Sequence, residues 1–339
     1  MPLKDLIKAA AERPLTIEEA EDAFDQLMQG RATHVQIAAL LVAIRVRGAV
    51  PEEVAGGVRA LRRAMVPIAV PPGADVVDTC GTGGGSMITF NISTAAALLA
   101  SGLGVKVAKH GNRSFTSRCG SADVLEALGV RLDLKPARQA RVLEEVGIVF
   151  LFAPNHHPAM RHVGPVRREL GMVTIMNLLG PLTNPAGARR QVVGVLDPAL
   201  LPLVSGALLT LGHERALVVH GEPGLDELSP IGVTHIVQVA DGAARSFTFD
   251  PRRELGWDRF DQAELAGGEP SENAAVIAEV LRGRRGGAAR SAVLLNAAAA
   301  LVVADRVSDL RQGVEVAEQG LDSGAGWEQL ERLRSASTR

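Results

Sequence analysis

Residues 1–66 place their apolar positions at helical spacing and show no strand-like alternation. Thr16 and Glu19 have the spacing of a helix-capping box, and a glycine follows where that helix would end. Thr33 opens a second helical run, and Pro51 suits the first turn of a third. This part of the chain is therefore predicted to form a small helical lobe.

The run Ile37–Ile44 inside this lobe is apolar on nearly every side of its helix. A helix of that kind is buried on more than one side. In so small a lobe, a second subunit is the simplest cover for the other side. The pattern predicts a homodimer joined through the helical lobe.

After a proline-rich hinge at 66–74, short apolar runs alternate with helical segments. Such alternation indicates a mainly parallel sheet with helices on both faces. The expected strands are 75–78, 105–108, 148–152, 191–195 and 216–219, and the helices between them are 94–101, 121–129, 137–146, 159–170 and 199–211. Residues 234–239 and 244–250 look like later antiparallel strands, and helices return at 272–282 and 291–335.

The predicted fold class is α/β, with a small N-terminal helical domain over residues 1–72. A larger domain over residues 73–339 is expected to hold the mainly parallel sheet covered by helices. A segment near 160–190 is expected to pack with the helical domain. The chain has 339 residues, of which 47% are hydrophobic, enough for a large core.

The net charge of −2 argues against broad electrostatic binding to nucleic acids or acidic membranes. Cys80 and Cys119 have no metal-binding spacing and suggest small packing residues in a reducing cytoplasm. The N-terminus lacks the apolar core of a signal peptide. The apolar stretch 292–304 is too short to span a bilayer and contains Asn296.

The first candidate for chemistry is the segment 81–85, in which four of five residues are glycine. It lies between a strand-like run and a helix-like run, where Ser93 or Thr94 could cap the helix. Glycine-rich turns before a helix bind anions, most often phosphate. The Walker pattern fails because no lysine follows, and the dinucleotide fingerprint fails at Ser86. A turn without a ligand remains the alternative.

Three further polar clusters follow expected strands, at 108–129, 156–171 and 218–230. Ligands of open parallel sheets bind beyond the carboxyl ends of the strands, so these clusters should lie together. The first has donors and cations suited to phosphate oxygens, although a solvated loop is the alternative. The second has several arginines, among which the pattern does not choose. Asp226 and Glu227 in the third could bind Mg²⁺, or could simply be solvated.

Taken together, these segments resemble the anthranilate phosphoribosyltransferase family of tryptophan biosynthesis, within the wider group of nucleoside phosphorylase-like and phosphoribosyltransferase enzymes. The resemblance covers nearly the whole chain. It is carried by "GTGG", "TFNIST", "VAKHGNRS", "GSADVLEALG", "HPAMRHVGPVRRELG", "NLLGPLTNPA" and "GEPGLDELSP", in this order.

The resemblance implies a transferase that uses 5-phosphoribosyl 1-diphosphate, anthranilate and Mg²⁺. The donor-binding residues it implies are Gly81, Gly84, Gly85, Thr89, Asn91, Ile92, Ser93, Thr94, Lys109, His110, Gly111, Asn112, Arg113, Ser114, Phe115, Thr116, Ser117 and Ser121. The implied anthranilate-binding residues are Gly81, His110, Asn112 and Arg167, and the implied metal ligands are Ser93, Asp226 and Glu227. The family also implies a homodimer joined through the helical lobe.

The implied reaction is attack of the aromatic amine on C1 of the ribose as diphosphate leaves. Mg²⁺, Lys109 and backbone N–H groups would stabilise the leaving group. No residue is assigned with certainty as catalytic: His110 could act as a base or only position the substrate. The chain departs from the family at Gly85, where an aspartate is usual, which bears on how the first metal is held.

Two rival functions remain from the sequence. A pyrimidine-nucleoside phosphorylase would share the architecture but lacks the "KHGNR" wording. A nucleic-acid-binding relative without catalysis would be expected to carry a basic surface and altered loops, whereas this chain is slightly acidic and keeps both loops.

Overall fold

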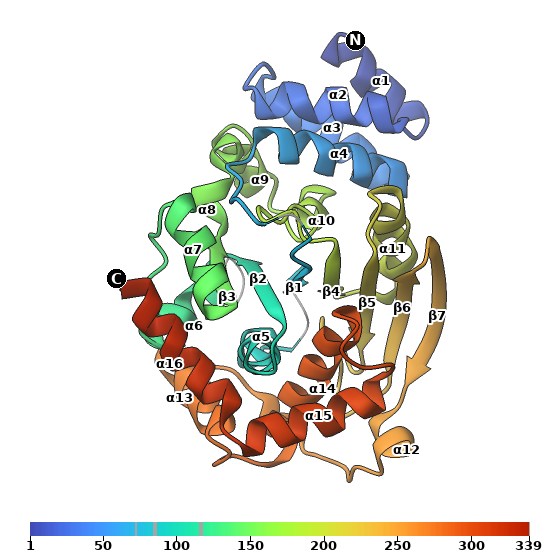
Figure 1. The fold of residues 1–339 in the computed structure, drawn as a ribbon. Coiled ribbons are helices and arrows are strands. Elements are labelled where there is room, and N and C mark those ends of the chain that lie inside the picture. Colours follow the sequence, from blue (N-terminus) through green and yellow to red (C-terminus); the bar gives the residue numbers. More distant parts are fainter. Residues whose placement is uncertain (72, 84–86, 115–117, 339) are drawn as a thin grey trace.

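The computed structural model describes residues 1–71, 73–83, 87–114 and 118–338. Its N-terminal part is helical, as predicted, and forms the blue lobe at the top of Figure 1. The helices are α1 (Leu3–Glu12), α2 (Ile17–Met28), α3 (His34–Arg47) and α4 (Pro51–Ala64). Thr16 and Thr33 each form the expected capping box, and Pro51 opens α4.

The larger part is built on one sheet of the order β3-β2-β1-β4-β5-β6-β7. Its strands are β1 (Val76–Gly81), β2 (Lys106–Gly111), β3 (Ile148–Phe152), β4 (Arg190–Gly194), β5 (Arg215–Gly221), β6 (Thr234–Ala240) and β7 (Ala243–Phe249). The first five strands pair in parallel, and β6 and β7 are antiparallel, with Val77 opposite Val107 and Val218 opposite Val237. This confirms the predicted fold class.

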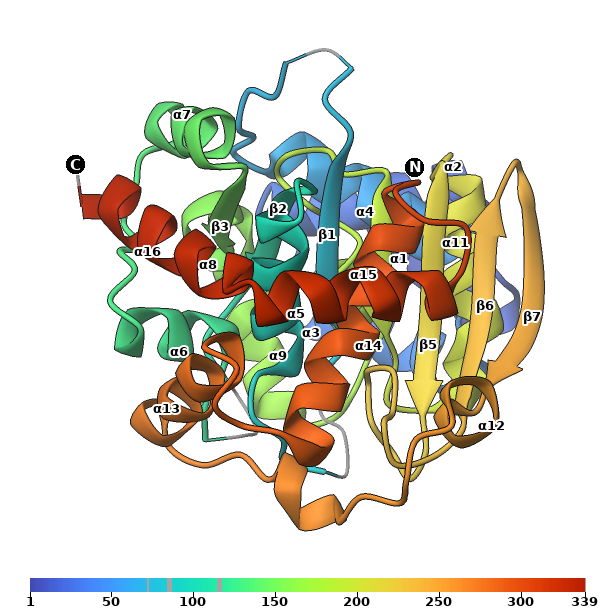
Figure 2. The ribbon, with the colours of Figure 1, turned by 60° about the horizontal axis from the view of Figure 1, so that its bottom comes forward.

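Helices cover the sheet from two sides. Figure 2 shows α5, α14 and α15 crossing one side, while α11 contacts β5, β6 and the helix α4 of the lobe. The bounds are α5 (Ile92–Gly102), α6 (Ser121–Ala127), α7 (Pro136–Val146), α8 (Ala153–His156), α9 (Gly164–Leu170), α10 (Met176–Leu179), α11 (Leu201–Thr210), α12 (Pro251–Leu255), α13 (Pro270–Leu281), α14 (Gly287–Val303), α15 (Leu310–Asp322) and α16 (Ala325–Thr338), with short 3₁₀ turns at η1 (Pro158–Arg161), η2 (Pro198–Leu200) and η3 (Gln262–Leu265).

The core divides into two buried clusters, one on each side of the sheet. One joins α5 and α14 to the strands. The other joins the helical lobe to α10, α11 and strands β4 and β5, and it includes Val163, Val166 and Leu179. The segment between residues 160 and 190 thus packs against the helical lobe.

One expected helix is broken. The pattern predicts a helix over 159–170, but the chain forms the turn η1 and then α9, which begins at Gly164. Pro165 explains the break, because proline has no N–H and fits the first turn of a helix better than its interior.

The apolar helix α3 is buried along one side by its own chain. Ile37, Leu40, Leu41 and Ile44 are buried inside their own chain, at 0–1% exposure. They pack within the lobe's own cluster, and α1 and α9 contact α3. Ala38, Val42 and Ala43 of the same run remain partly exposed, so cover of its other side by a second subunit stays a prediction. The apolar residues that α3 leaves exposed are Val35 and Val46.

No helix in the described ranges is both long enough and apolar enough to cross a membrane. Cys80 and Cys119 are free thiols, one partly buried and one buried.

Candidate active site

The carboxyl ends of β1, β2 and β5 bring three of the sequence clusters to one edge of the sheet. Gly81 ends β1, Gly111 ends β2, and Gly221 ends β5 before the Asp226–Glu227 loop. The first and last loops touch directly, since the Gly83 amide donates to Asp226 Oδ2 at 3.0 Å. A Cβ at Gly81 would collide with the same carboxylate, so glycine is needed for this close approach.

The start of α5 supplies the next part of the site. The helix begins at Ile92, and Asn91 occupies its N-cap position without a side-chain cap bond. The prediction that Ser93 or Thr94 caps this helix is therefore wrong. Because the helix starts earlier, the Ser93 amide is one of its unpaired first-turn donors, and it bonds Glu227 Oε1 at 3.1 Å. Thr94 is buried against the core.

Lys109 reaches this point from β2. Its ammonium donates to the Ser93 hydroxyl at 3.2 Å, to the Thr79 hydroxyl at 3.3 Å and to the Thr79 carbonyl. The side chain is buried, and burial lowers its pKa. Lys109 therefore places a positive charge deep in the site and orients the Ser93 hydroxyl.

The two carboxylates of this loop lie side by side and are partly buried. Burial, followed by the neighbouring charge of Asp226, raises the pKa of Glu227 to about 8, and burial also raises the pKa of Asp226. Glu227 Oε2 has no hydrogen-bond partner among the described residues. A small pocket lined by Thr79, Ser93, Asp226, Glu227 and Asn296 lies here.

These residues fit a hard divalent cation. Two adjacent carboxylates and a hydroxyl are oxygen ligands of the kind Mg²⁺ binds, and Mg²⁺ needs few protein ligands. A cation would also relieve the burial of two negative charges. Within the part of the chain that the structure describes, no three His, Cys, Asp or Glu side chains gather as a transition-metal site would require.

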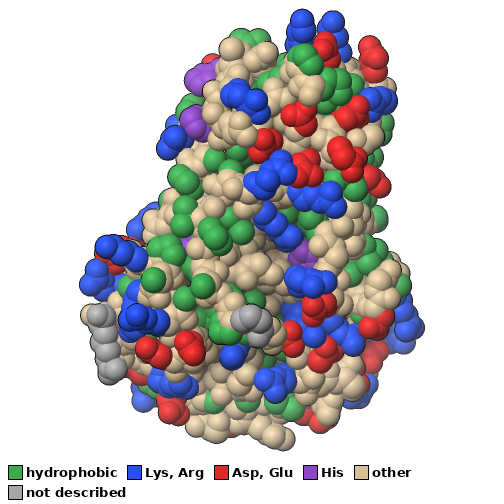
Figure 3. All heavy atoms as spheres, turned by 45° about the horizontal axis from the view of Figure 1, so that its top comes forward, with side chains coloured by type: hydrophobic (Ala, Val, Ile, Leu, Met, Phe, Trp, Pro, Cys, Tyr) green, Lys and Arg blue, Asp and Glu red, His purple; other side chains and the backbone are tan. Residues whose placement is uncertain are grey.

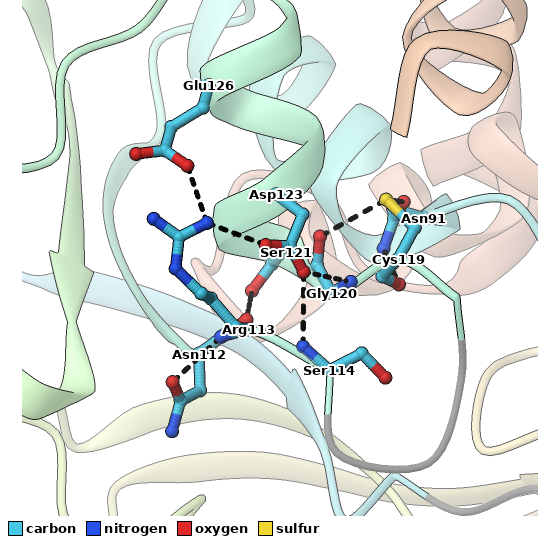
Figure 4. Close-up of polar contacts among 9 residues, drawn as sticks. All are labelled: Asn91, Asn112, Arg113, Ser114, Cys119, Gly120, Ser121, Asp123 and Glu126. Carbon is cyan, nitrogen blue, oxygen red and sulfur yellow. Dashed lines mark hydrogen bonds and ion pairs between the residues drawn. The ribbon is translucent and has the colours of Figure 1, made fainter. Parts of the chain in front are cut away.

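The loop after β2 is shown in Figure 4. Arg113 forms ion pairs with Asp123 at 2.7 Å and Glu126 at 2.6 Å, and lies over the Phe152 ring. The Asn112 carbonyl accepts the Ser121 hydroxyl at 3.3 Å. The guanidinium of Arg113, expected to bind the donor, is thus held by acidic side chains of its own chain.

Asn91 has a bracing role that its motif did not reveal. Its amide nitrogen donates to the Cys119 carbonyl at 3.2 Å, and its oxygen accepts from Asn273 of α13 at 3.0 Å. The segment before it is tied to the turn η3 by a bridge between Thr89 and Ala266. Asn91 thereby ties the start of α5 to Cys119 in the loop after β2 and to α13.

His110 lies at the buried end of β2. Its Nε2 is 3.1 Å from Nε2 of His157, so one ring must donate to the other. Burial first, then the neighbouring His157, holds the pKa of His110 well below its usual value. His110 is thus neutral at pH 7.

Two residues that sequence reasoning missed hold this region. Asp78 is buried in β1, accepts the His110 amide at 3.0 Å and accepts the Asn184 side chain at 2.8 Å. Asn296 of α14 bonds both the amide and the carbonyl of Leu228, which fixes the Asp226–Glu227 loop. For Asn296 the signal was available, because it is the single polar residue inside the apolar run 292–304, whereas Asp78 stands beside Thr79 at the end of a short apolar run.

Arg167 lies on α9, and its side chain is partly buried. Burial lowers its pKa, and its guanidinium forms no ion pair or hydrogen bond with any described residue. No hydrogen bond joins its guanidinium to His110 or Asn112. Gly84, Gly85, Phe115, Thr116 and Ser117 lie outside the described residues. Figure 3 shows Lys, Arg and His side chains on the face between the two parts of the molecule, a setting that favours anions.

Comparison with known proteins agrees with this arrangement. The glycosyl transferase family matches in two parts: its helical bundle domain over residues 4–65 and its a/b domain over residues 73–327. The anthranilate phosphoribosyltransferase of Rubrobacter xylanophilus is 49% identical, with 98% of this chain and 97% of that protein covered. The Roseiflexus castenholzii protein of the same name is also 49% identical, covering 100% and 99%.

Solved structures give the same result. The anthranilate phosphoribosyltransferase of Thermus thermophilus superposes with a TM-score of 0.93 at 45% identity, covering 99% of this chain and 100% of that one. The Saccharomyces cerevisiae enzyme in complex with PRPP and Mg superposes with a TM-score of 0.88 at 27% identity, covering 99% and 98%. By these matches, which span both the helical lobe and the sheet with its strand-end loops, the chain belongs to the anthranilate phosphoribosyltransferase family.

Proposed function

We propose that this protein transfers the 5-phosphoribosyl group from 5-phosphoribosyl 1-diphosphate to the amine of anthranilate, in tryptophan biosynthesis. The products are N-(5-phosphoribosyl)anthranilate and diphosphate. The observation that carries the proposal is the meeting of the glycine loop, the first turn of α5 and the Asp226–Glu227 pair at one sheet edge. Helix-start amides suit the anionic donor, and the paired carboxylates suit its counter-cation.

The amine nitrogen forms a bond to C1 while the bond from C1 to the diphosphate oxygen breaks and its electron pair leaves with diphosphate. The amine then releases a proton. Ser93, Asp226 and Glu227 would hold Mg²⁺, which supplies positive charge for the departing diphosphate. Lys109 adds charge beside them, although Thr79 and Ser93 already occupy its donor groups. The yeast relative, solved in complex with PRPP and Mg, supports the use of Mg²⁺ with this donor.

Arg167 is proposed to bind the anthranilate carboxylate, because it is a partly buried cation without an acidic partner in the described chain. His110, Asn112 and Gly81 are proposed to line the same substrate. Since His110 Nε2 already pairs with His157, we assign His110 a positioning role. The yeast enzyme in complex with 4-fluoroanthranilate supports an anthranilate site in this fold.

The remaining donor contacts are proposed at the glycine loop and the 109–121 loop, as the resemblance implies. Gly84, Gly85 and residues 115–117 are included in this proposal on sequence alone. The cytoplasmic location stays a prediction from the two cysteines.

The reaction is tested by following anthranilate fluorescence in the presence of donor and Mg²⁺. The signal should fall only when both are present. Phosphorolysis of thymidine or uridine by phosphate would instead indicate a nucleoside phosphorylase. A shift of single-stranded DNA on a gel, with no loss of fluorescence, would indicate a non-catalytic relative that binds nucleic acid.

We also propose a homodimer formed by the helical lobe, through the face of α3 that its own chain leaves exposed. Val35 and Val46 of α3 are 78% and 80% exposed, and Met172 and Val173 follow α9, which contacts α3. Exposed apolar residues on adjoining segments mark an interface. Val35→Asp with Val46→Asp should halve the mass measured by light scattering. An unchanged dimer mass would place the interface elsewhere.

A further inference from the structure

Asp123 of the short helix α6 is a carboxylate that the proposed reaction does not use. Its Oδ2 accepts two backbone amides, Gly120 N at 2.9 Å and Ser114 N at 3.2 Å. Its Oδ1 accepts Arg113 Nη1 at 2.7 Å. Figure 4 shows these donors converging on Asp123 from both sides of the loop.

The two amides come from opposite ends of one loop. Ser114 follows the end of β2, and Gly120 precedes the start of α6. The ends lie so close that a Cβ at Gly120 would overlap backbone atoms of Ser114 and Arg113. The Asn112 carbonyl adds to this junction by accepting the Ala122 amide at 3.2 Å. The side chain of Asp123 is therefore placed where it can hold the loop ends together.

The electrostatics agree with such a role. Burial alone would raise the pKa of Asp123, but the Gly120 amide and the Arg113 guanidinium lower it overall. Its carboxylate is ionised at neutral pH and already receives donors on both oxygens. A carboxylate in this state has no attraction for an anionic donor molecule. It acts on the substrate only through the groups that it holds.

We propose that Asp123 is a positioning residue that fixes the loop after β2 in its donor-binding form, by holding the Ser114 and Gly120 amides on one oxygen and Arg113 on the other. The inference rests on the proposed function, because it assigns this loop to the phosphoribosyl diphosphate.

The arrangement allows the two oxygens to be tested separately. Both amides bond to Oδ2, so Asp123→Asn can keep these two bonds while it loses the charge that faces Arg113. Asp123→Ala loses all three contacts. Glu126→Gln is the matched control, because Glu126 pairs with Arg113 but bonds to neither loop end. Its side chain is also more exposed, at 44% against 18% for Asp123.

The experiment is steady-state kinetics with each substrate varied in turn. Asp123→Ala should raise the KM for 5-phosphoribosyl 1-diphosphate at least tenfold, with kcat and the KM for anthranilate within twofold of wild type. Asp123→Asn should raise the donor KM less than Asp123→Ala does. Glu126→Gln should stay within twofold throughout. A donor KM within twofold of wild type in Asp123→Ala, or an equal rise in both KM values, overturns the proposal.

Gly120→Ala gives a second test of the same junction if Asp123→Ala does not fold. Gly120 has φ −91°, which alanine adopts freely, so the change acts only by forcing the loop ends apart. It should raise the donor KM and leave the anthranilate KM unchanged, and an unaltered donor KM overturns the proposal. Loss of all activity in the wild-type protein would count against the proposed function instead.

Discussion

Glu227 and Asp123 are carboxylates in two loops of the same site, and their surroundings are opposite. Glu227 is partly buried, has one oxygen without a hydrogen-bond partner in the described chain, and has a pKa raised by burial to about 8. Asp123 is partly exposed, receives donors on both oxygens, and has a pKa lowered by them. Among the described residues, Glu227 keeps one oxygen without a hydrogen-bond donor, whereas both oxygens of Asp123 already accept hydrogen bonds.

The difference distinguishes a carboxylate that is suited to bind a ligand from one that stabilises a loop of the protein itself. An unpaired buried carboxylate raises the free energy of the metal-free protein, which is tolerated where a cation will bind. A satisfied carboxylate stabilises its loop and has nothing left to offer a ligand. Residues of the same type, a short distance apart, can therefore be assigned different roles by counting their donors.

The strongest test of this comparison is Asp226→Asn with Glu227→Gln. Activity should fall by about 100-fold or more, because the proposed metal ligands are lost, and high Mg²⁺ should restore part of it. The metal-free variant should nevertheless be more stable to urea, by roughly 1–3 kcal/mol, because neutral amides replace two carboxyl groups whose pKa values are raised by burial. Initial rates across a Mg²⁺ titration and urea unfolding measure the two effects.

Asp123→Ala is the matched opposite, because it removes a satisfied carboxylate. It should lower the stability to urea, whereas the double variant raises it. A Mg²⁺ curve like that of wild type in the double variant would refute the assignment of the metal ligands. A loss of stability in both proteins would remove the distinction between the two carboxylates.

The sequence predicted what depends on periodicity and failed where packing decides. Alternating apolar runs located all seven strands, and Thr16, Thr33 and Pro51 marked helix starts correctly. For the apolar run of α3, helical spacing did not show which neighbours cover each side. α1 and α9 contact this helix from within the chain.

For the site, the motifs located the loops but not the groups that hold them. Asp78 and Asn296 act through tertiary contacts with His110 and Leu228, far away in the sequence. Arg113 was expected to face the donor, yet Asp123 and Glu126 hold it. No local pattern shows which of several partners a side chain will find, because this depends on how distant segments meet.

A neutral buried group extends the comparison to pH. Burial, followed by the charge of His156, lowers the pKa of His157 to about 4. In the unfolded chain a histidine has a pKa of about 6.5, so the unfolded state binds the proton first as the pH falls. The stability that neutral His157 contributes should be fully present above pH 6.5 and should be lost progressively towards pH 4. Between pH 7 and 5 the loss from this residue should be about 2 kcal/mol.

His157→Gln should remove that part of the pH dependence, measured by urea unfolding at pH 7 and pH 5. The quantity to compare is the change in the free energy of unfolding between the two pH values, because the variant also loses its contact with His110 at both. His34→Gln, at an exposed position at the start of α3, is the control and should leave the difference unchanged. An equal pH difference in wild type and His157→Gln would show that this ring is not kept neutral by the fold.

Arg167 is the cationic counterpart of Glu227: a partly buried charge without a partner in the described chain, its pKa lowered by burial. Like Glu227, this arginine is suited to bind a ligand of opposite charge, and the proposed ligand is the carboxylate of anthranilate. A hydrogen bond to a charged group contributes about 1.5–3 kcal/mol. Arg167→Ala should therefore raise the KM for anthranilate at least tenfold and leave the donor KM nearly unchanged. Arg168→Ala is the matched control, because Arg168 is the next residue on α9 and its side chain is exposed. Unaltered anthranilate kinetics in Arg167→Ala would show that a partly buried charge without a partner does not mark the substrate site. The Mg²⁺ titration of the Asp226 and Glu227 double variant would then be the remaining test of the role of Glu227.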